Sequence, residues 1–351
     1  TNCIKTNWIS SQGKFVSQFE KQFSVYHNNL NALSVSNGTV AIHLALVALG
    51  VGKGDEVIIP NLTFAASINA VIHCGATPVL ADVDLDSWNI DILQIESLIG
   101  EKTKAIMAVH LFGNPCKVFE LMELTKKYNL YLVQDCAESL GSLFNNEPLG
   151  IFGDVATFSF FGNKTITTGE GGMIIFKDPD IYKKANILRD HGMNKTKRYW
   201  HDFVGYNYRL TNLQAAVGVA QFERLDYFVK RKKTIAKIYF NNLNHHHFFK
   251  FQKAENNAFN SNWLFTIVLI KNNKFKKEDL MEYLGDKGIE TRPIFFPLNV
   301  MNPYKNFGKS KKLKISNEIS ANGFSLPSSA SLSDEEAIYI CDHINIFIKN
   351  L

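Results

Sequence analysis

The chain has 351 residues, 46% of them hydrophobic and 20% charged, with a formal net charge of +5, and it is long enough for two globular domains. The positive charge is small and is not clustered with aromatic residues, which argues against nucleic acid as a partner, and no apolar run approaches the length that spans a membrane. Five widely spaced cysteines without a CxxC pair argue against a disulfide framework or a zinc site, so we expect no metal and a cytoplasmic location.

The chain begins with a polar segment that leads into a helix. Residues 1–14 are mostly polar and are expected to be irregular, with Trp8 exposed. The next segment is predicted to be a helix, because Phe15, Phe19 and Phe23 are spaced four apart and would share one face.

A turn before the second helix is the first candidate binding element. Residues 33–35 are predicted to end a strand, and residues 36–39, with the sequence SNGT, form a turn before an apolar helix that ends at Gly50. The free backbone N–H groups at such a helix start lie at the positive end of the helix dipole and suit a phosphate. An ordinary helix cap explains the same residues, so both interpretations stay open.

Strand and helix patterns then alternate as far as residue 135. Strands are expected at residues 56–59, 77–81, 105–111 and 130–135. Helices are expected at residues 64–74, 92–98 and 118–128. This alternation is typical of a parallel sheet with helices on both faces, so the predicted fold class is α/β. The chain contains neither a GxGxxG turn after a strand nor a GxxxxGK[ST] loop, the dinucleotide and P-loop motifs.

Two carboxylates lie at the end of the last of these strands. Asp135 ends the apolar segment LYLVQD, and Glu138 follows three residues later. Ligands of open α/β sheets bind at the carboxyl ends of the strands. A carboxylate there is desolvated and needs a cationic or hydrogen-bonding partner, such as a protonated pyridine nitrogen. A helix cap or a buried pair with an arginine explains Asp135 equally well.

The stretch from Asp154 to Ile175 contains the candidate nucleophile. It reads as an apolar strand, a polar loop with Lys164, a glycine cluster and a second apolar strand. Flanking strands predict that the loop belongs to an interior, where lost hydration lowers the pKa of a lysine and makes its amine a usable nucleophile. The alternative is a surface lysine whose stem alone is covered.

The last third of the chain differs in composition. Helices are expected at residues 180–189, at 211–220 with Thr211 as the cap, and at 227–243, 277–287 and 334–348. A strand is expected at residues 263–269. Because Lys, Asn, Phe and His increase and glycines decrease after residue 226, we predict a large domain at 1–226 and a smaller α+β domain at 227–351.

Six motifs in order resemble the DegT/DnrJ/EryC1/StrS family of sugar aminotransferases. They are SNGTVAIHLAL, PNLTFAASINAV, GATPVLADVD, QDCAESLGS, FSFFGNKTITTGEGGM and GYNYRLTNLQAA. The resemblance covers nearly the whole chain. It implies a pyridoxal 5'-phosphate enzyme of fold type I, with a three-layer α/β/α large domain around a mostly parallel sheet. The segments around Lys164 and residues 188–216 look most like those of members that aminate a GDP-linked 4-keto-6-deoxy sugar.

The resemblance also implies roles for individual residues. Lys164 matches the lysine that binds the cofactor covalently and moves the proton, and Asp135 matches the partner of the pyridinium nitrogen. The remaining matches are Gly38, Thr39 and Ser159 at the phosphate, Phe64 stacked on the ring, Glu138 near the ring hydroxyl, and Asn207 reaching the phosphate of the neighbouring subunit. A homodimer with shared active sites is therefore implied. The candidate substrate residues are Trp8, Arg209, Arg292 and Asn299, and Asn299 departs from the histidine that the family usually has there.

The predicted function is transfer of an amino group from L-glutamate to a nucleotide-linked 4-keto-6-deoxy sugar in lipopolysaccharide or capsule biosynthesis. The same chemistry on a small phosphorylated ketone such as dihydroxyacetone phosphate is the main alternative, and Asn299 keeps it open. A sugar dehydratase of the same fold would carry histidine in place of Lys164. A non-catalytic regulator that binds pyridoxal phosphate or a nucleotide would need a lost lysine or an added DNA-binding segment, and neither is present.

Overall fold

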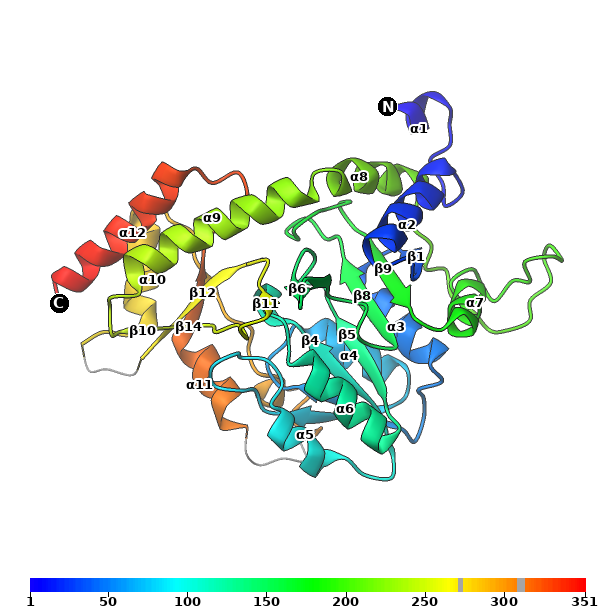
Figure 1. The fold of residues 1–351 in the computed structure, drawn as a ribbon, viewed down its shortest axis with the longest axis horizontal. Coiled ribbons are helices and arrows are strands. Elements are labelled where there is room, and N and C mark those ends of the chain that lie inside the picture. The colour runs from blue at the N-terminus through cyan, green and yellow to red at the C-terminus, as the bar shows by residue number, and fades with distance from the viewer. Residues whose placement is uncertain (271–273, 308–312) are drawn as a thin grey trace.

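A computed structural model describes residues 1–270, 274–307 and 313–351. At its centre lies a seven-stranded sheet in the order β1-β9-β8-β5-β4-β2-β3 (Figure 1). The strands are β1 (Asn31–Val35), β2 (Glu56–Pro60), β3 (Thr77–Ala81), β4 (Thr103–Val109), β5 (Tyr131–Asp135), β8 (Val155–Ser159) and β9 (Gly172–Phe176). Only β9 runs opposite to the other six, which confirms the prediction of a mostly parallel sheet.

Helices cover both faces of this sheet because successive side chains of the strands point to opposite sides. In β2, Val57 and Ile59 belong to the core that includes α3, whereas Ile58 belongs to the core that includes α5 and α6. The helices of this part are α1 (Asn2–Lys5), α2 (Lys14–Tyr26), α3 (Gly38–Ala48), α4 (Ala65–His73), α5 (Ile92–Leu98), α6 (Val118–Tyr128), α7 (Pro179–Leu188) and α8 (Asn212–Phe222). The apolar residues of β2 thus pack into two cores on opposite faces of the sheet, as the sequence pattern predicts.

A second, smaller sheet lies at the other end of the long helix α9 (Leu225–Leu243), with the C-terminus beside it (Figure 1). Its order is β10-β12-β14-β13. The strands are β10 (Phe249–Phe251), β12 (Phe265–Leu269), β13 (Arg292–Pro293) and β14 (Gly323–Leu326), and the helices are α10 (Lys277–Asp286), α11 (Lys314–Asn322) and α12 (Asp334–Lys349). Helix α9 runs across the division at residues 226 and 227, which stays a prediction.

The later part of the chain also returns to the large sheet. Strand β11 (Ala258–Phe259) pairs with β6 (Leu143–Phe144), which in turn pairs with β7 (Glu147–Pro148). This small sheet anchors the segment that leads to Trp263, and it thereby places a residue from beyond α9 beside the strand ends of the large sheet.

The expectation of an irregular start is wrong at α1, where Asn2 to Lys5 form one helical turn that buries Cys3. The thiol of Cys3 contacts Asn212 of α8, and this long-range contact has no counterpart in the local pattern. Helix α11 and strand β14 were not predicted. Among the described residues, no helix combines the length and the apolar character that crossing a membrane requires.

Candidate active site

A cavity of about 670 Å³ lies at the carboxyl ends of β4 and β5, where α3 and α4 begin. Its wall includes seven of the residues that the sequence singles out: Gly38, Thr39, Phe64, Asp135, Glu138, Ser159 and Lys164. Strand ends, helix starts and the loop between β8 and β9 meet here, which is the place where open α/β sheets bind ligands.

Lys164 projects into this cavity from the loop between β8 and β9. Its side chain is 14% exposed, and its Nζ lies 4.0 Å from Oε1 of Glu138 and 3.9 Å from the centre of the Trp263 ring. Burial lowers the pKa of Lys164, and the negative charges of Glu138 and Asp135 oppose that shift. The prediction of an interior loop is wrong for residues 161–163, which are exposed, whereas Thr165, Ile166 and Thr168 are buried.

Asp135 ends β5 at the floor of the cavity. Its Oδ2 accepts a hydrogen bond from Oγ of Ser67 at 2.9 Å, and its Oδ1 accepts one from the backbone N–H of Ala137 at 3.1 Å. Burial raises the pKa of Asp135, whereas these hydrogen bonds and Lys164 lower it. Among the described residues, Asp135 therefore neither pairs with an arginine nor caps a helix, the two alternatives that the sequence left open. A cationic group in the cavity would favour its ionised form.

Glu138 completes a triangle of ionisable groups with Asp135 and Lys164. Its Oε2 accepts a hydrogen bond from the backbone N–H of Phe112 at 2.8 Å. Burial raises the pKa of Glu138 to about 7, although Lys164 and the Phe112 N–H oppose the shift. This carboxyl therefore exchanges its proton near neutral pH, within reach of the amine.

We expect the raised pKa of Glu138 to make the apoprotein less stable as pH rises. The folded protein holds the Glu138 proton between pH 4.5 and about 7, whereas the unfolded chain releases it, so the free energy of unfolding decreases across this window by at most about 3 kcal/mol. Glu138→Gln should remove this component, which urea unfolding of both proteins at pH 5 and pH 8 would measure. An unchanged difference between the two pH values in the variant would contradict the assignment.

The start of α3 forms the other end of the cavity. Oδ1 of Asn37 accepts the N–H of Val40, so the cap interpretation is correct, but within the described residues the N–H groups of Gly38 and Thr39 have no acceptor. A Cβ on Gly38 would lie 2.7 Å from Cβ of Ser159, so only glycine allows the helix start to approach this hydroxyl. Free N–H groups at a helix start beside a hydroxyl form a site for a phosphate.

Phe64 forms an aromatic wall of the same cavity. It is 58% exposed at the start of α4, with its ring centre 5.7 Å from that of Phe295. An exposed ring that lines a cavity is not core packing. Together with a phosphate site, a buried carboxylate and a desolvated amine, it fits pyridoxal phosphate, the cofactor that the resemblance implies.

Trp263 was missed by the sequence interpretation. It is 3% exposed, and its indole N–H donates to the backbone carbonyl of Asn163, the neighbour of Lys164, at 2.8 Å. It lies 99 positions after the lysine, and a tryptophan beside an apolar strand reads as core. Long-range contacts, among them the pairing of β11 with β6 and the hydrogen bond between Ser261 and Ser142, bring it here, so no local signal could have identified it.

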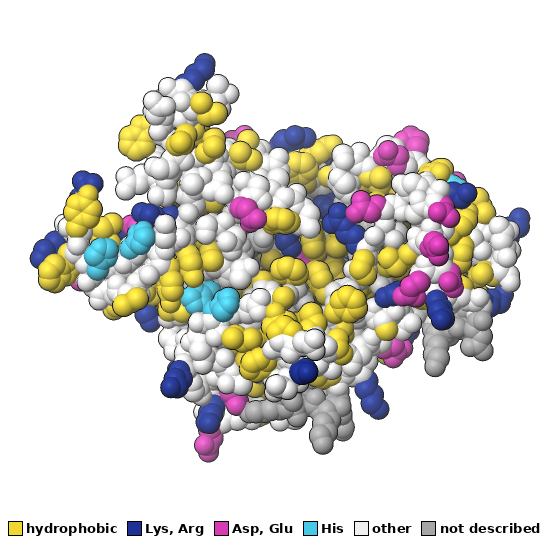
Figure 2. Space-filling view, turned by 180° about the vertical axis from the view of Figure 1, so that it is seen from behind, with side chains coloured by type: hydrophobic (Ala, Val, Ile, Leu, Met, Phe, Trp, Pro, Cys, Tyr) yellow, Lys and Arg dark blue, Asp and Glu magenta, His cyan; other side chains and the backbone are white. Residues whose placement is uncertain are grey.

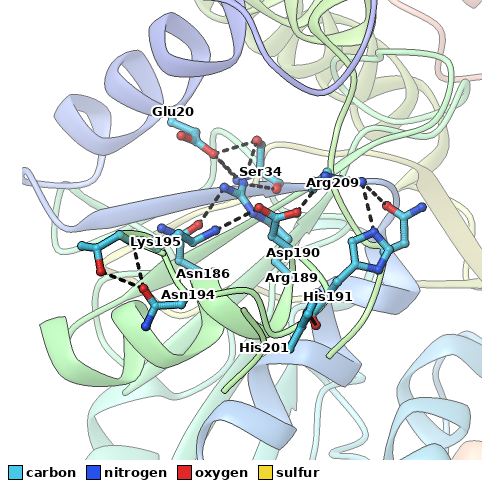
Figure 3. Close-up of polar contacts among 12 residues, drawn as sticks. Glu20, Ser34, Asn186, Arg189, Asp190, His191, Asn194, Lys195, His201 and Arg209 are labelled. Carbon is cyan, nitrogen blue, oxygen red and sulfur yellow. Dashed lines mark hydrogen bonds and ion pairs between the residues drawn. The ribbon is translucent and has the colours of Figure 1, made fainter. Parts of the chain in front are cut away.

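The other predicted site residues do not line this cavity. Nη1 of Arg209 lies 2.7 Å from Oδ1 of Asp190, and its Nη2 donates to Oδ1 of Asn207 and to Nε2 of His191. Figure 3 shows Arg209 turned toward Asp190 and His191 in a network that continues to Lys195. This network joins residues 190 and 191 to residues 207 and 209. It thereby fixes both ends of the segment 192–206, which follows α7 and is called the arm below. Trp8 is exposed near the N-terminus, away from Lys164.

Asn299 and Arg292 lie outside the cavity for different reasons. Oδ1 of Asn299 accepts a hydrogen bond from Nδ2 of Asn61 at 2.8 Å, and its N–H donates to Oδ1 of Asn61 at 3.0 Å. This side-chain and backbone pair ties the 3₁₀ turn Leu298–Val300 to the end of β2. Arg292 is exposed, pairs with Glu290 at 3.5 Å, and lines a second cavity.

Comparison with known proteins agrees with this geometry. The profile of the DegT/DnrJ/EryC1/StrS aminotransferase family matches residues 1–345. The chain is 45% identical over 348 residues to the GDP-perosamine synthase of Escherichia coli O157:H7, an alignment that covers 99% of this chain and 94% of that protein.

Solved structures agree as well. Helicobacter pylori PseC, an aminotransferase involved in the biosynthesis of pseudoaminic acid, superposes with a TM-score of 0.93 at 27% identity and covers 100% of this chain and 95% of its own. The E. coli GDP-4-keto-6-deoxy-D-mannose-3-dehydratase with bound hydrated PLP superposes with a TM-score of 0.90 at 25% identity and covers 97% and 94%.

Proposed function

Because this chain belongs to the DegT/DnrJ/EryC1/StrS aminotransferase family, we propose that Lys164 and Asp135 hold its pyridoxal phosphate and that L-glutamate is its amino donor. The enzyme is a pyridoxal-phosphate-dependent aminotransferase. The observation that carries the assignment is the meeting of a desolvated amine and a buried strand-end carboxylate in one cavity of about 670 Å³.

The cofactor is held by groups at opposite ends of the cavity. The N–H groups of Gly38 and Thr39, with the hydroxyl of Ser159, would bind the phosphate. Phe64 would cover one face of the ring, and the carboxylate of Asp135 would accept a hydrogen bond from the protonated ring nitrogen. Pyridoxal phosphate, once bound, supplies a conjugated ring that takes up the electron pair left when a substrate carbon loses its proton.

Lys164 performs the proton transfers of the reaction. Its Nζ would hold the cofactor covalently, and the same amine would serve as the base that moves the proton of the donor carbon. Burial lowers the pKa of Nζ, which favours the unprotonated amine compared with an exposed lysine. Glu138, 4.0 Å away with a pKa of about 7, receives or returns a proton as the charge on Nζ changes.

We take the acceptor to be a nucleotide-linked 4-keto-6-deoxy sugar used for a surface polysaccharide. Support comes from the 45% identity with the E. coli GDP-perosamine synthase across nearly the whole chain. A sugar dehydratase is disfavoured by Lys164, and a non-catalytic regulator is disfavoured because this lysine is retained in the cavity. Asn299 was the reason to consider a small phosphorylated ketone as the acceptor. It pairs with Asn61 and does not line the cavity, which gives this alternative less support.

The proposed assembly is a homodimer in the cytoplasm. Trp8, Tyr199, Trp200, Phe203 and Val204 are between 50% and 95% exposed. Figure 2 shows hydrophobic side chains at the surface of the arm after α7 and near the N-terminus, a patch that a second copy would cover. The network around Arg209 holds Asn207 at the base of this arm, from which it would reach the partner's phosphate site.

A substrate panel tests the proposed function. With L-glutamate as donor, we expect amination of a GDP-linked 4-keto-6-deoxy sugar with a kcat/KM at least about tenfold above that for the UDP- and dTDP-linked analogues and dihydroxyacetone phosphate. Release of 2-oxoglutarate is the readout, and a reaction mixture without acceptor is the control. Dihydroxyacetone phosphate as the preferred acceptor would overturn the sugar assignment.

A further inference from the structure

A second cavity, of about 590 Å³, adjoins the first and shares Asn163, Lys164 and Trp263 with it. It lies between the Lys164 loop, helix α9 and strands β13 and β14. The cofactor contacts proposed above use none of its other residues. A substrate held near Nζ of Lys164 therefore lies next to this second cavity.

Three further cations from different elements line this second cavity: Arg224 before α9, Lys232 within α9 and Arg292 in β13. One carboxylate, Glu290, accompanies them and pairs with Arg292 at 3.5 Å. In the described part of the chain, neither Arg224 nor Lys232 lies within ion-pair distance of a carboxylate. The cavity thus holds an excess of positive charge that the protein itself does not neutralise.

Lys232 is the strongest indication that an anion belongs here. It is 7% exposed, and Nζ donates to the backbone carbonyls of Trp263 at 3.0 Å and Ser328 at 2.8 Å. An ammonium has three N–H donors, so one is left for a ligand. Burial lowers the pKa of Lys232 to about 8, and no neighbouring negative charge opposes this shift. A buried ammonium without a counter-ion is costly, and a bound anion would offset that cost.

We propose that this second cavity binds a carboxylate of the amino donor while the amine-bearing carbon of the donor lies at Lys164. The inference rests on the proposed function, since it needs a dicarboxylic donor. Trp263 links the two positions, because Lys232 binds its backbone carbonyl and Lys164 contacts its ring. The cavity would then select glutamate over amino acids without a second carboxylate. The diphosphate of a nucleotide sugar is the other anion with suitable chemistry, and the test separates the two.

The test uses the holoenzyme titrated with L-glutamate in the absence of acceptor, with cofactor absorbance as the readout. We expect Arg224→Gln and Arg292→Gln to raise the half-saturating glutamate concentration about 3- to 10-fold, and Lys232→Met about 10-fold or more. Lys237→Met, an exposed lysine of the same helix outside both cavities, is the matched control and should match the wild type.

A second measurement separates binding from chemistry. Glutarate, an unreactive dicarboxylate, should bind the wild-type holoenzyme by calorimetry at least about tenfold more tightly than butyrate, and the Arg224 and Arg292 variants should lose this difference. These two side chains are exposed, so their replacement leaves the core intact even if Lys232→Met disturbs Trp263.

The outcomes are distinguishable. If the cofactor absorbance of the wild-type enzyme does not change with glutamate, the assignment of glutamate as the donor is wrong. The glutarate measurement would still show whether the second cavity binds a dicarboxylate. A normal response with the same half-saturation in all variants, and no preference for glutarate, would overturn the cavity assignment. Variants that raise the KM of the GDP-linked sugar alone would assign the cavity to the diphosphate and overturn the carboxylate proposal.

Discussion

Replacing Lys164 with alanine is expected to abolish transamination, with a decrease in kcat on the order of 10⁴-fold or more. No other lysine lines the first cavity among the described residues, and the nearest ionisable groups, Glu138 and Asp135, cannot form a covalent bond with the cofactor aldehyde. The alanine variant therefore loses both the attachment point and the base that moves the proton.

Borohydride reduction provides a readout other than activity. After reduction, we expect the wild type to carry one cofactor mass per chain on the peptide that contains Lys164, and the variant to carry none. Lys177→Ala, an exposed lysine just after β9, serves as the control and should behave as the wild type does. Normal turnover in the Lys164 variant, or label on a different lysine, would refute the assignment.

The sequence was sufficient for the elements whose signal is local. Segment 56–59 is apolar at every position after its glutamate, which indicates a strand buried on both faces, and β2 serves two cores in that way. Thr211 was predicted as the cap of α8 from its local sequence, and the structure confirms it there, with Gln214 completing a capping box. Lys164 and Asp135 were found because each is a polar residue beside an apolar strand.

What the sequence did not predict depends on contacts between distant segments. Trp263 reaches Lys164 through long-range contacts such as the pairing of β11 with β6, and the hydrogen bonds of Asn299 run to a residue 238 positions away. The cations of the second cavity come from the start and the middle of α9 and from β13, and each taken alone in the sequence is typical of a surface charge. Local periodicity cannot predict such long-range contacts, since it indicates which face of an element is buried but not which other element covers that face.

Asn299 departs from the family pattern, and its effect on the choice of acceptor stays a prediction. The sequence suggested that the identity of the acceptor depends on this residue. In the structure its side chain and backbone both bind Asn61, which also donates to Ser316 of α11 at 2.7 Å. An asparagine there thus joins β2 to the segment that leads to α11. We therefore expect the replacement of the usual histidine at this position to affect substrate choice less than changes in the second cavity do.

Asp135→Asn is expected to lower kcat about 10²- to 10⁴-fold while leaving the fold intact. The amide has nearly the volume of the carboxylate, and its oxygen can still accept a hydrogen bond from Ser67 or Ala137, so thermal unfolding of the apoprotein should change little. The amide has no negative charge to keep the ring nitrogen of the cofactor protonated. Without that protonation the ring would withdraw electrons only weakly.

If the charge of Asp135 limits the rate, Ser67→Ala should decrease kcat in the same direction as Asp135→Asn but by a smaller factor. Loss of the 2.9 Å hydrogen bond to Oδ2 removes one of the contacts that favour the ionised carboxylate, so we expect a decrease of about tenfold, well short of that for Asp135→Asn. Single-turnover conversion of the cofactor by glutamate would measure both variants. Near-normal conversion in Asp135→Asn would mean that the reaction does not need a charged partner at the ring nitrogen. A Ser67→Ala loss as large as that of Asp135→Asn would mean that position, not charge, limits the rate.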